Sequence, residues 1–340
     1  MKKLSLEKLP TLFAAIAEKE TLYLPVDAES GARFERYSEG KSLSSELNTV
    51  RSAKDFFFPQ TESLVEFKME GKNIEVIDPR TETENFVIFG VRACDARSFS
   101  ILDKVFLVDP VDTYYKNRRE HGTIVSLACT RPHETCFCQT FGIDATDPEG
   151  DVAAWKTDDA IYFDAKTEKG AVLLSALSDL LNDVDDAAVN EQKKATKEIL
   201  GKLPLKELTT DGFGGDVMME KFNAPEWKSL SEACLGCGTC TFVCPTCQCY
   251  DIKDFNTGHG IKRFRCWDSC MYSDFTKMAH GNPRTSQLER FRQRFMHKLV
   301  YFPANNEGEF GCVGCGRCLQ KCPISMNIVK VMKTLGGKKA

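Results

Sequence analysis

Cysteines are the residues of this sequence whose spacing could support chemistry. Of the 16 in the chain, twelve lie between Cys234 and Cys322. The pattern Cys-x2-Cys-x2-Cys-x3-Cys-Pro begins at Cys234 and recurs at Cys312. This is the spacing with which bacterial ferredoxins hold [4Fe–4S] clusters, because three close cysteines wrap around one corner of a cubane and the fourth ligates the other cluster. The repeat therefore predicts two clusters.

The exchange of the fourth cysteine between the two motifs predicts the ligands. The alternative is a pair of zinc sites, but structural zinc is usually held by two separated Cys-x2-Cys pairs rather than by one continuous run. Glycines inside the motifs are expected to let backbone N–H groups approach the sulfides. We assign cluster I to Cys234, Cys237, Cys240 and Cys322, and cluster II to Cys312, Cys315, Cys318 and Cys244.

Four more cysteines lie in the first half of the chain, namely Cys94, Cys129, Cys136 and Cys138. They suffice for a third [4Fe–4S] cluster, cluster III. Their irregular spacing also fits buried structural cysteines or a metal site in which His133 replaces one thiol. Cys94 and Cys129 each follow a predicted buried strand, so both are expected at one edge of a sheet, where open α/β sheets build binding sites.

The remaining cysteines, Cys247, Cys249, Cys266 and Cys270, lie between the two motifs. One interpretation of them is a fourth metal site. The interpretation that we favour is that these thiols pack beside cluster II and tune it, since burial and hydrogen bonds around the sulfurs set a cluster's potential.

The elements that must position these cysteines differ between the two halves of the chain. In the first half we expect a helix over 4–19, another over 95–105 and helical segments over 171–202. Short runs rich in β-forming residues predict strands at 21–26, 64–69, 73–78, 86–90, 122–129 and 160–165.

The second half is expected to contain short helices and loops, with one longer helix inside 282–302. Ser286 and Glu289 are a predicted capping box at the start of that helix. Its basic residues, which we expect to form either a docking face for an acidic partner or a solvated face, are Arg290, Arg292, Arg294 and Lys298.

These expectations define an α+β fold class. An α/β domain over 1–205 carries the third cluster site, and 206–225 is a linker. A ferredoxin-like, mainly α domain over 226–340 carries clusters I and II, with a large insertion at 246–311.

Composition narrows the function classes. A net charge of −4 and a pI near 5.9 argue against a nucleic-acid-binding surface for the whole chain. The sequence has no run of eighteen apolar residues, so we expect no membrane-spanning helix. The N-terminal segment lacks the continuous apolar core of a signal peptide, so we expect a cytoplasmic protein. In a reducing compartment, clustered thiols more often bind metal or carry out redox work than form disulfides.

With these residues in view, nearly the whole chain resembles a known family: the iron–sulfur β subunits of cytoplasmic sulfhydrogenases and the corresponding iron–sulfur subunits of anaerobic sulfite reductases, which are 4Fe–4S dicluster proteins. The segments that carry the resemblance are FGVRACDARSFSILDKVF, DTYYKNRREH, CFCQTFG, CLGCGTCTFVCPTCQCYD, RCWDSCMYSDFTKMAHGNPR, RFRQRFMHKL and CVGCGRCLQKCP. The N-terminal 80 residues and residues 150–225 carry little of it.

The resemblance implies an electron-transfer subunit of a multisubunit complex in an anaerobic or microaerobic organism. In such complexes a flavin subunit exchanges electrons with NAD(P)H. The iron–sulfur subunit relays them to a hydrogenase, a sulfite reductase or a heterodisulfide-reductase-like subunit. The flavin is expected on the partner, because the sequence has no G-x-G-x-x-G after a predicted strand. The resemblance also strengthens the prediction of cluster III.

The sequence offers no recognised acid, base or nucleophile set, so whether this chain is itself an enzyme stays open. A relay needs no such set, since electrons move one at a time between clusters. An alternative is a catalytic reductase of sulfur compounds, with an open iron at the N-terminal cysteines. A free-standing carrier is a third interpretation, but the chain is much longer than that role needs.

Overall fold

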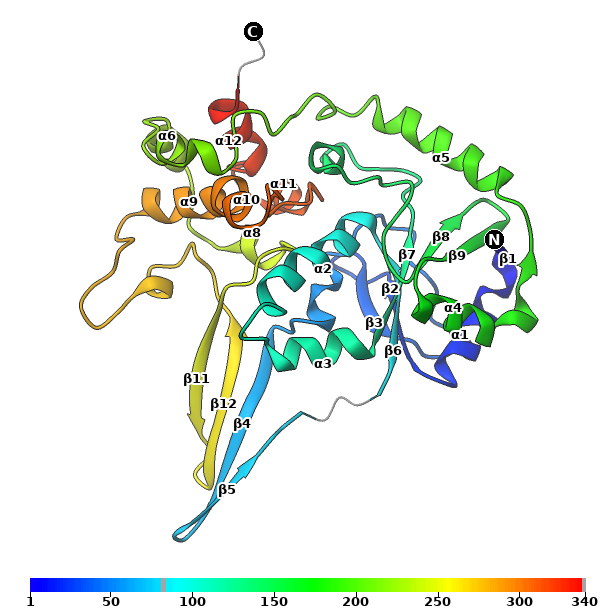
Figure 1. The fold of residues 1–340 in the computed structure, drawn as a ribbon, viewed down its shortest axis with the longest axis horizontal. Helices are drawn as coiled ribbons and strands as arrows, with labels where there is room; N and C mark the ends of the chain where they lie inside the picture. Colours follow the sequence, from blue (N-terminus) through cyan, green and yellow to red (C-terminus); the bar gives the residue numbers. More distant parts are fainter. Residues whose placement is uncertain (81–83, 338–340) are drawn as a thin grey trace.

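The computed structural model describes residues 1–80 and 84–337. Residues 81–83 and 338–340, which fall in the predicted α/β domain and the predicted cluster domain, lie outside the described residues. A large sheet flanked by helices occupies one side of the molecule, a group of helices the other, and a narrow arm of strands projects between them (Figure 1). No helix in the described ranges has both the length and the hydropathy that a bilayer crossing requires.

The large sheet has eight strands and a mixed topology. Its four inner strands are parallel, and the strands added on both sides are antiparallel. The predicted strands at 21–26 and 160–165 are confirmed without change, and those at 86–90 and 122–129 are confirmed with small shifts of their ends. In spatial order the strands are β10 (Asn182–Asp183), β1 (Lys2–Ser5), β9 (Ala160–Ala165), β8 (Val152–Lys156), β7 (Gly122–Leu127), β6 (Phe86–Val91), β2 (Thr21–Val26) and β3 (Arg33–Arg36).

Helices cover both faces of this sheet, as parallel strands require. The alternation of side chains along β6 shows the two layers, because Val87 and Phe89 pack in one core and Ile88 in another. The first core includes α1 (Leu9–Ala17) and α4 (Glu168–Ala176), and the second includes α2 (Ala93–Phe106) and α3 (Thr113–His121). A further helix, α5 (Ala187–Leu200), packs against the outer strands. The α+β fold class is confirmed.

The N-terminal helix is shorter than predicted. Residues 4 and 5 belong to β1, which pairs with β9 and β10. The helix begins at Leu9, with Pro10 in its first turn, where a residue without a backbone N–H is well tolerated. The apolar periodicity of the segment did not reveal the strand, because long-range pairing formed it. The predicted helical region at 171–202 is likewise interrupted, by β10 between α4 and α5.

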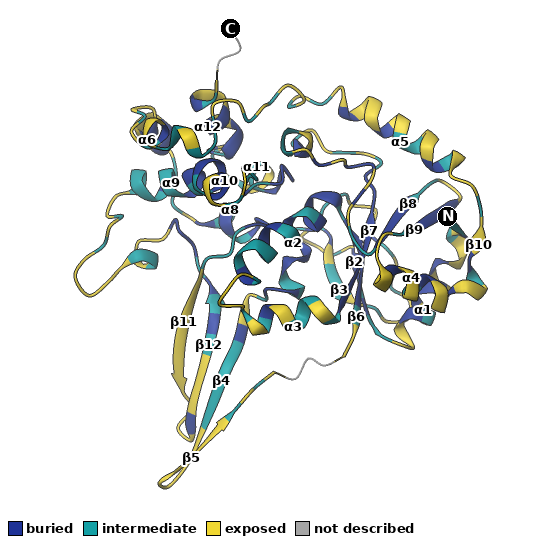
Figure 2. Ribbon diagram, in the orientation of Figure 1, coloured by how far each residue is buried: buried dark blue, intermediate teal, exposed yellow. Residues whose placement is uncertain are grey.

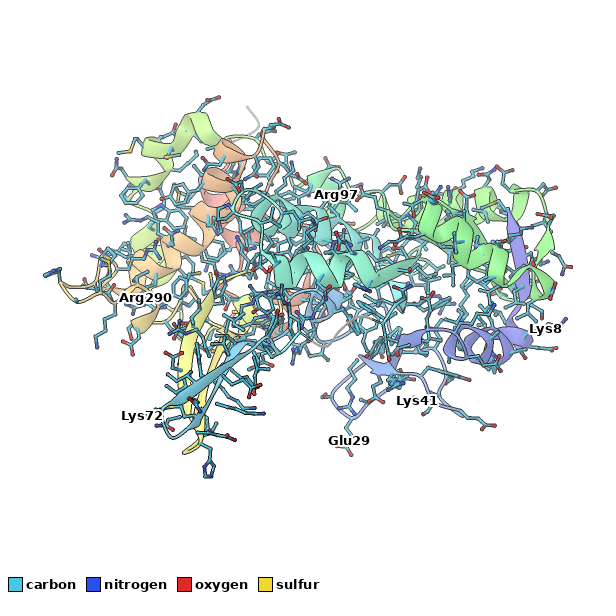
Figure 3. The ribbon with its side chains drawn as sticks, turned by 60° about the horizontal axis from the view of Figure 1, so that its bottom comes forward. Lys8, Glu29, Lys41, Lys72, Arg97 and Arg290 are labelled. Atoms are coloured by element: carbon cyan, nitrogen blue, oxygen red, sulfur yellow. The ribbon has the colours of Figure 1, made fainter. Side chains whose placement is uncertain are left out.

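The projecting arm is a four-stranded antiparallel sheet assembled from both halves of the chain. In order its strands are β11 (Tyr250–Asn256), β12 (Gly260–Trp267), β4 (Thr61–Glu70) and β5 (Asn73–Ile77). The predicted strand at 64–69 lies within β4, and the one at 73–78 corresponds to β5, which ends one residue earlier. Most of β11 and β5 is exposed, whereas β6 and β7 are buried (Figure 2). Lys72 lies in the turn at the tip (Figure 3).

The β11–β12 hairpin was not predicted, because all of β11 is exposed and neither strand has the apolar alternation of a half-buried strand. Charged side chains at its base join it to the first half of the chain. Arg265 on β12 forms ion pairs with Glu62 and Asp112, and Glu62 also pairs with Arg118. The division of the chain at 206–225 stays a prediction, and the arm shows that the two halves are interleaved.

The helical part carries both cysteine motifs. Ser286 and Glu289 form the predicted capping box at the start of its longest helix. That helix continues through a π-helical turn at His297–Tyr301 into the next one. The helices are α6 (Met218–Phe222), α7 (Trp227–Ser231), α8 (Thr239–Phe242), α9 (Gln287–Met296), α10 (Phe302–Asn305), α11 (Arg317–Lys321) and α12 (Ile328–Leu335).

Candidate metal centres

The cysteines of the second motif surround one cavity together with the fourth cysteine of the first motif. Phe137, Arg294 and Lys298 contribute to the wall of this cavity. The Cys318 thiol interacts electrostatically with the other three thiols, so the set is brought together across a long stretch of sequence. The four cysteines that line the cavity are Cys244, Cys312, Cys315 and Cys318.

The two glycines of the second motif lie directly against a loop of the first half of the chain. A Cβ on Gly314 would stand 2.4 Å from the carbonyl oxygen of Phe137, and one on Gly316 would stand 2.7 Å from that of Thr135. Both glycines also have positive φ. The Phe137 N–H donates to the Gly314 carbonyl at 2.9 Å. These glycines therefore allow the loop that carries Cys136 and Cys138 to dock on the motif.

The first motif has the same local structure but different neighbours. Helices α8 and α11, which carry the third cysteine of each motif, pack against each other. The Gln287 side-chain amide donates to the Cys234 sulfur at 3.3 Å. Cys237 is exposed, and Leu235 is 65% exposed. Cys322 packs on the same core as Cys234. This end of the site lies at the surface.

The four N-terminal cysteines come together and are all buried. Cys94 lies in the first turn of α2, just after β6, and Cys129 follows β7, as predicted from the strand ends. The Cys138 thiol interacts electrostatically with Cys129 and Cys136, and Cys94 interacts with Cys138. His133, the alternative ligand, is exposed, and its Nδ1 lies 2.9 Å from Thr135 Oγ1.

This N-terminal group lies next to the second motif. Cys94, Cys138 and Cys315 belong to one buried core, and each of the first two interacts electrostatically with the third. The neighbouring residues Asp95 and Arg317 form a bidentate ion pair at 2.5 and 2.7 Å, with side chains only 1% and 2% exposed. The guanidinium therefore fastens α11 to α2 between the two cysteine groups.

Two buried cations lie between the cysteine motifs. Arg294 and Lys298 are 3% and 5% exposed, so the expectation of a docking or solvated face is wrong for both. The Lys298 ammonium donates to Thr246 Oγ1 at 2.7 Å and to the Gly311 carbonyl at 2.9 Å. Among the described residues, Nε and Nη1 of Arg294 are buried without a hydrogen-bond acceptor. Buried N–H donors of this kind need an anion.

The pKa values of these groups follow from the same burial. Burial raises the pKa of the Cys312 thiol to about 12, that of Cys138 to about 12 and that of Cys136 to about 11. Burial alone would lower the pKa of Lys298, but the surrounding thiols, Cys244 first among them, raise it. Buried thiols deprotonate when a metal supplies the compensating charge.

The residues present therefore fit a [4Fe–4S] cluster at the second motif. Four thiols line one cavity, and the unpaired Arg294 N–H groups lie where sulfides would accept hydrogen bonds. The zinc alternative requires ligands that converge on one metal ion. Within 1–80 and 84–337, no three Cys, His, Asp or Glu side chains do so.

The cysteines between the motifs do not form one group of four. Cys247 lies near Cys244 and lowers its pKa, and Cys270 lies near Cys249 and lowers its pKa. Cys266 lies apart on β12, where its nearest charged groups are Lys253, Asp251 and Asp268. Buried Lys54 donates to the Cys247 carbonyl at 2.8 Å, and burial lowers the pKa of its ammonium to about 8.

Sequence reasoning missed the residues that join the cysteine groups. Lys54, Asp95 and Arg317 were not singled out, although Asp95 adjoins Cys94 and Arg317 lies inside the second motif. A charged residue inside a cysteine motif is a usable signal, because a charge so close to four thiolates usually affects the properties of the metal site.

Comparisons with known proteins agree with this geometry. A family model described as a 4Fe–4S dicluster domain matches residues 233–326, which contain both motifs and the segment between them. Over 333 residues the chain is 34% identical to sulfhydrogenase 2 subunit beta of Pyrococcus furiosus, covering 97% of this chain and 96% of that protein. No solved structure is significantly similar.

Proposed function

The chain belongs to the family of the sulfhydrogenase β subunit, with a 4Fe–4S dicluster domain, and on this premise we propose that it relays electrons inside a multisubunit oxidoreductase. A relay needs redox groups close together and shielded from water along the path, with at least one group near the surface. The cysteine groups described above have this arrangement.

The ligand sets of the proposal are those expected from the motifs. Cluster II is held by the four thiols around the common cavity, and cluster I by the set near the surface. Cluster III is held by the four buried N-terminal thiols. Burial of all four thiols supports a relay site over the alternative of an open iron that binds sulfur compounds from solution.

One observation carries the order of the relay. Cys315 of cluster II interacts electrostatically with Cys94 of the N-terminal group, and Cys244 of cluster II interacts with Cys240 of cluster I. Cluster II is therefore the middle station, between cluster III in the α/β part and cluster I at the surface. The exposed Cys237 and Leu235 mark cluster I as the station that faces a partner.

The partners in the proposal are a subunit that binds a flavin and NAD(P)H and a terminal subunit of the hydrogenase, sulfite reductase or heterodisulfide-reductase-like kind. No flavin is assigned to this chain. The relative's name supports a complex that contains a hydrogenase.

The full chain, purified without oxygen, tests the proposal by iron and sulfide counting together with EPR during stepwise reduction. Three clusters give about twelve irons per chain. The iron content should fall to about eight per chain in each of three single variants, Cys138→Ser, Cys318→Ser and Cys237→Ser. Cys266→Ser is the matched control and should keep all the iron.

The order is tested with the same variants in the assembled complex. If electrons enter at cluster I, Cys318→Ser should leave cluster III oxidised when the natural donor is added. Reduction of cluster III at the wild-type rate in that variant would contradict the order. Steady turnover of sulfite or polysulfide by this chain alone would contradict the relay itself.

A further inference from the structure

Cys249 and Cys270 lie on the two segments that close the base of the β11–β12 hairpin. Cys249 directly precedes β11, and its carbonyl accepts a hydrogen bond from the Asp268 N–H at 2.9 Å, just beyond β12. The chain then turns through Ser269 to Cys270. The Cys249 and Cys270 thiols are close enough for each to shift the pKa of the other, lowering that of Cys249 and raising that of Cys270.

This turn is held firmly against the first motif. Ser269 is fully buried, and its hydroxyl accepts a hydrogen bond from Thr241 Oγ1 at 2.8 Å. The same Ser269 oxygen accepts from the Met271 N–H at 3.1 Å. Thr241 lies on α8, one residue after Cys240. The position of Cys270 is therefore determined by packing on the motif and not by a flexible surface loop.

The contact between Cys249 and Cys270 differs from the arrangement in the cluster sets. Four thiols line the cavity of the second motif, as the separate corners of a cubane require, and Cys249 and Cys270 are not among them. Thiols already in contact are instead suited to an S–S bond of about 2 Å. Cys266, which a four-cysteine metal site would have needed, lies apart on β12.

The pair lies between the two cluster sites. Cys270 interacts electrostatically with Cys240 of cluster I. Cys249 interacts with Cys247, whose side chain contacts Cys244 of cluster II. An electron that leaves the pair has a cluster ligand close by on either side.

We propose that Cys249 and Cys270 are a redox-active dithiol that stores an electron pair beside clusters I and II. The inference rests on the proposed relay function. Oxidation forms one S–S bond, releases two protons to water and passes two electrons, one at a time, to oxidised [4Fe–4S] clusters. Reduction takes two electrons from reduced clusters and two protons from water. The pair thus lets clusters that carry one electron each exchange electrons with a partner that reacts with two.

The test is an electron count on the full chain with its clusters, purified without oxygen and oxidised mildly with a limited amount of ferricyanide. Reductive titration should consume one electron per cluster, as counted by iron and EPR, plus two more. Cys249→Ser and Cys270→Ser should each lose these two electrons and keep all their iron. Cys266→Ser, in the same hairpin, is the control and should keep both.

Mass spectrometry of the alkylated samples gives a second readout that does not depend on the clusters. The oxidised wild-type chain should yield a peptide linked through Cys249 and Cys270, and the reduced chain should yield both cysteines alkylated. Loss of about four irons in either variant would overturn the proposal, because the residue would then be a cluster ligand. Absence of both the linked peptide and the extra electrons, with clusters intact, would also overturn it.

These outcomes separate the dithiol from the relay. Absence of clusters I and II by iron and EPR defeats the relay, whatever the state of the cysteine pair. Intact clusters without the extra two electrons defeat the dithiol alone.

Discussion

The two cysteine motifs have the same spacing and the same local turn, yet their surroundings are opposite. The glycines of the second motif meet the backbone of the 135–138 loop, whereas those of the first meet the side chains of Gln287 and Tyr272. The second motif is covered by the α/β part, and the first reaches the surface at Cys237. A duplicated ligand pattern thus yields one interior site and one surface site, and what covers each motif gives it its place in the proposed relay.

The largest expected difference in stability between equivalent substitutions in the two motifs lies at the residue before the third cysteine of each motif. It is Arg317 in the second motif and Thr239 in the first. Arg317→Thr leaves Asp95 buried without its cation, which should lower the free energy of unfolding by about 3–5 kcal/mol. Chemical denaturation of the anaerobic protein measures this. Thr239→Val, the matched change at the surface motif, should cost less than about 1 kcal/mol. Equal losses of unfolding free energy in the two variants would contradict the difference between the interior and the surface motif.

The glycines give the second test. Gly314→Ala puts a Cβ 2.4 Å from a backbone oxygen, so the 135–138 loop must move. We expect a loss of about 2–4 kcal/mol from strain and overpacking, and release of the iron of the proposed cluster III. In Gly236→Ala the nearest atom is the flexible Gln287 Oε1 at 3.0 Å, so only the positive-φ strain of about 1–2 kcal/mol should remain. Iron counts and thermal unfolding distinguish the two; full iron in Gly314→Ala would refute the docking role.

The third test concerns the buried charge of Lys298 and its effect on the midpoint potential of cluster II. Removal of the cation in Lys298→Met should lower the midpoint potential of cluster II, because reduction adds negative charge beside it. With an effective dielectric near 20, the change is about 2 kcal/mol, or ~90 mV for one electron. EPR-monitored potentiometry measures the shift. Arg292→Met, on the same helix but stacked on Phe222, is the control and should leave the potential unchanged.

The smallest effect is expected at cluster I. Gln287→Ala removes the hydrogen bond to the Cys234 sulfur. This should lower the midpoint potential of cluster I by a few tens of mV, which is roughly a fewfold change in its one-electron reduction equilibrium. Gln293→Ala on the same helix is the matched control. A shift at cluster II in place of cluster I would mean that the two motifs are not separated as described.

Local patterns in the sequence predicted much of the fold. The strands at 21–26 and 86–90 and the capping box at Ser286 were visible because each depends on residues close together in the chain. Strand β1 was missed because its partner β9 is distant in the sequence. The β11–β12 hairpin was missed because its apolar patterning is weak. The helix that carries Arg294 and Lys298 was misjudged for a related reason. Charge normally marks a solvated face, and here buried thiols reverse that rule.

By itself, the sequence determined the chemistry of this protein. Ligand spacing within each Cys-x2-Cys-x2-Cys run is a local property, so two motifs and their prolines were sufficient to predict [4Fe–4S] clusters. Only the tertiary structure decided which motif is interior. That depends on a loop some 180 residues upstream and on an ion pair between residues 222 positions apart, and such contacts exist only once the chain is packed.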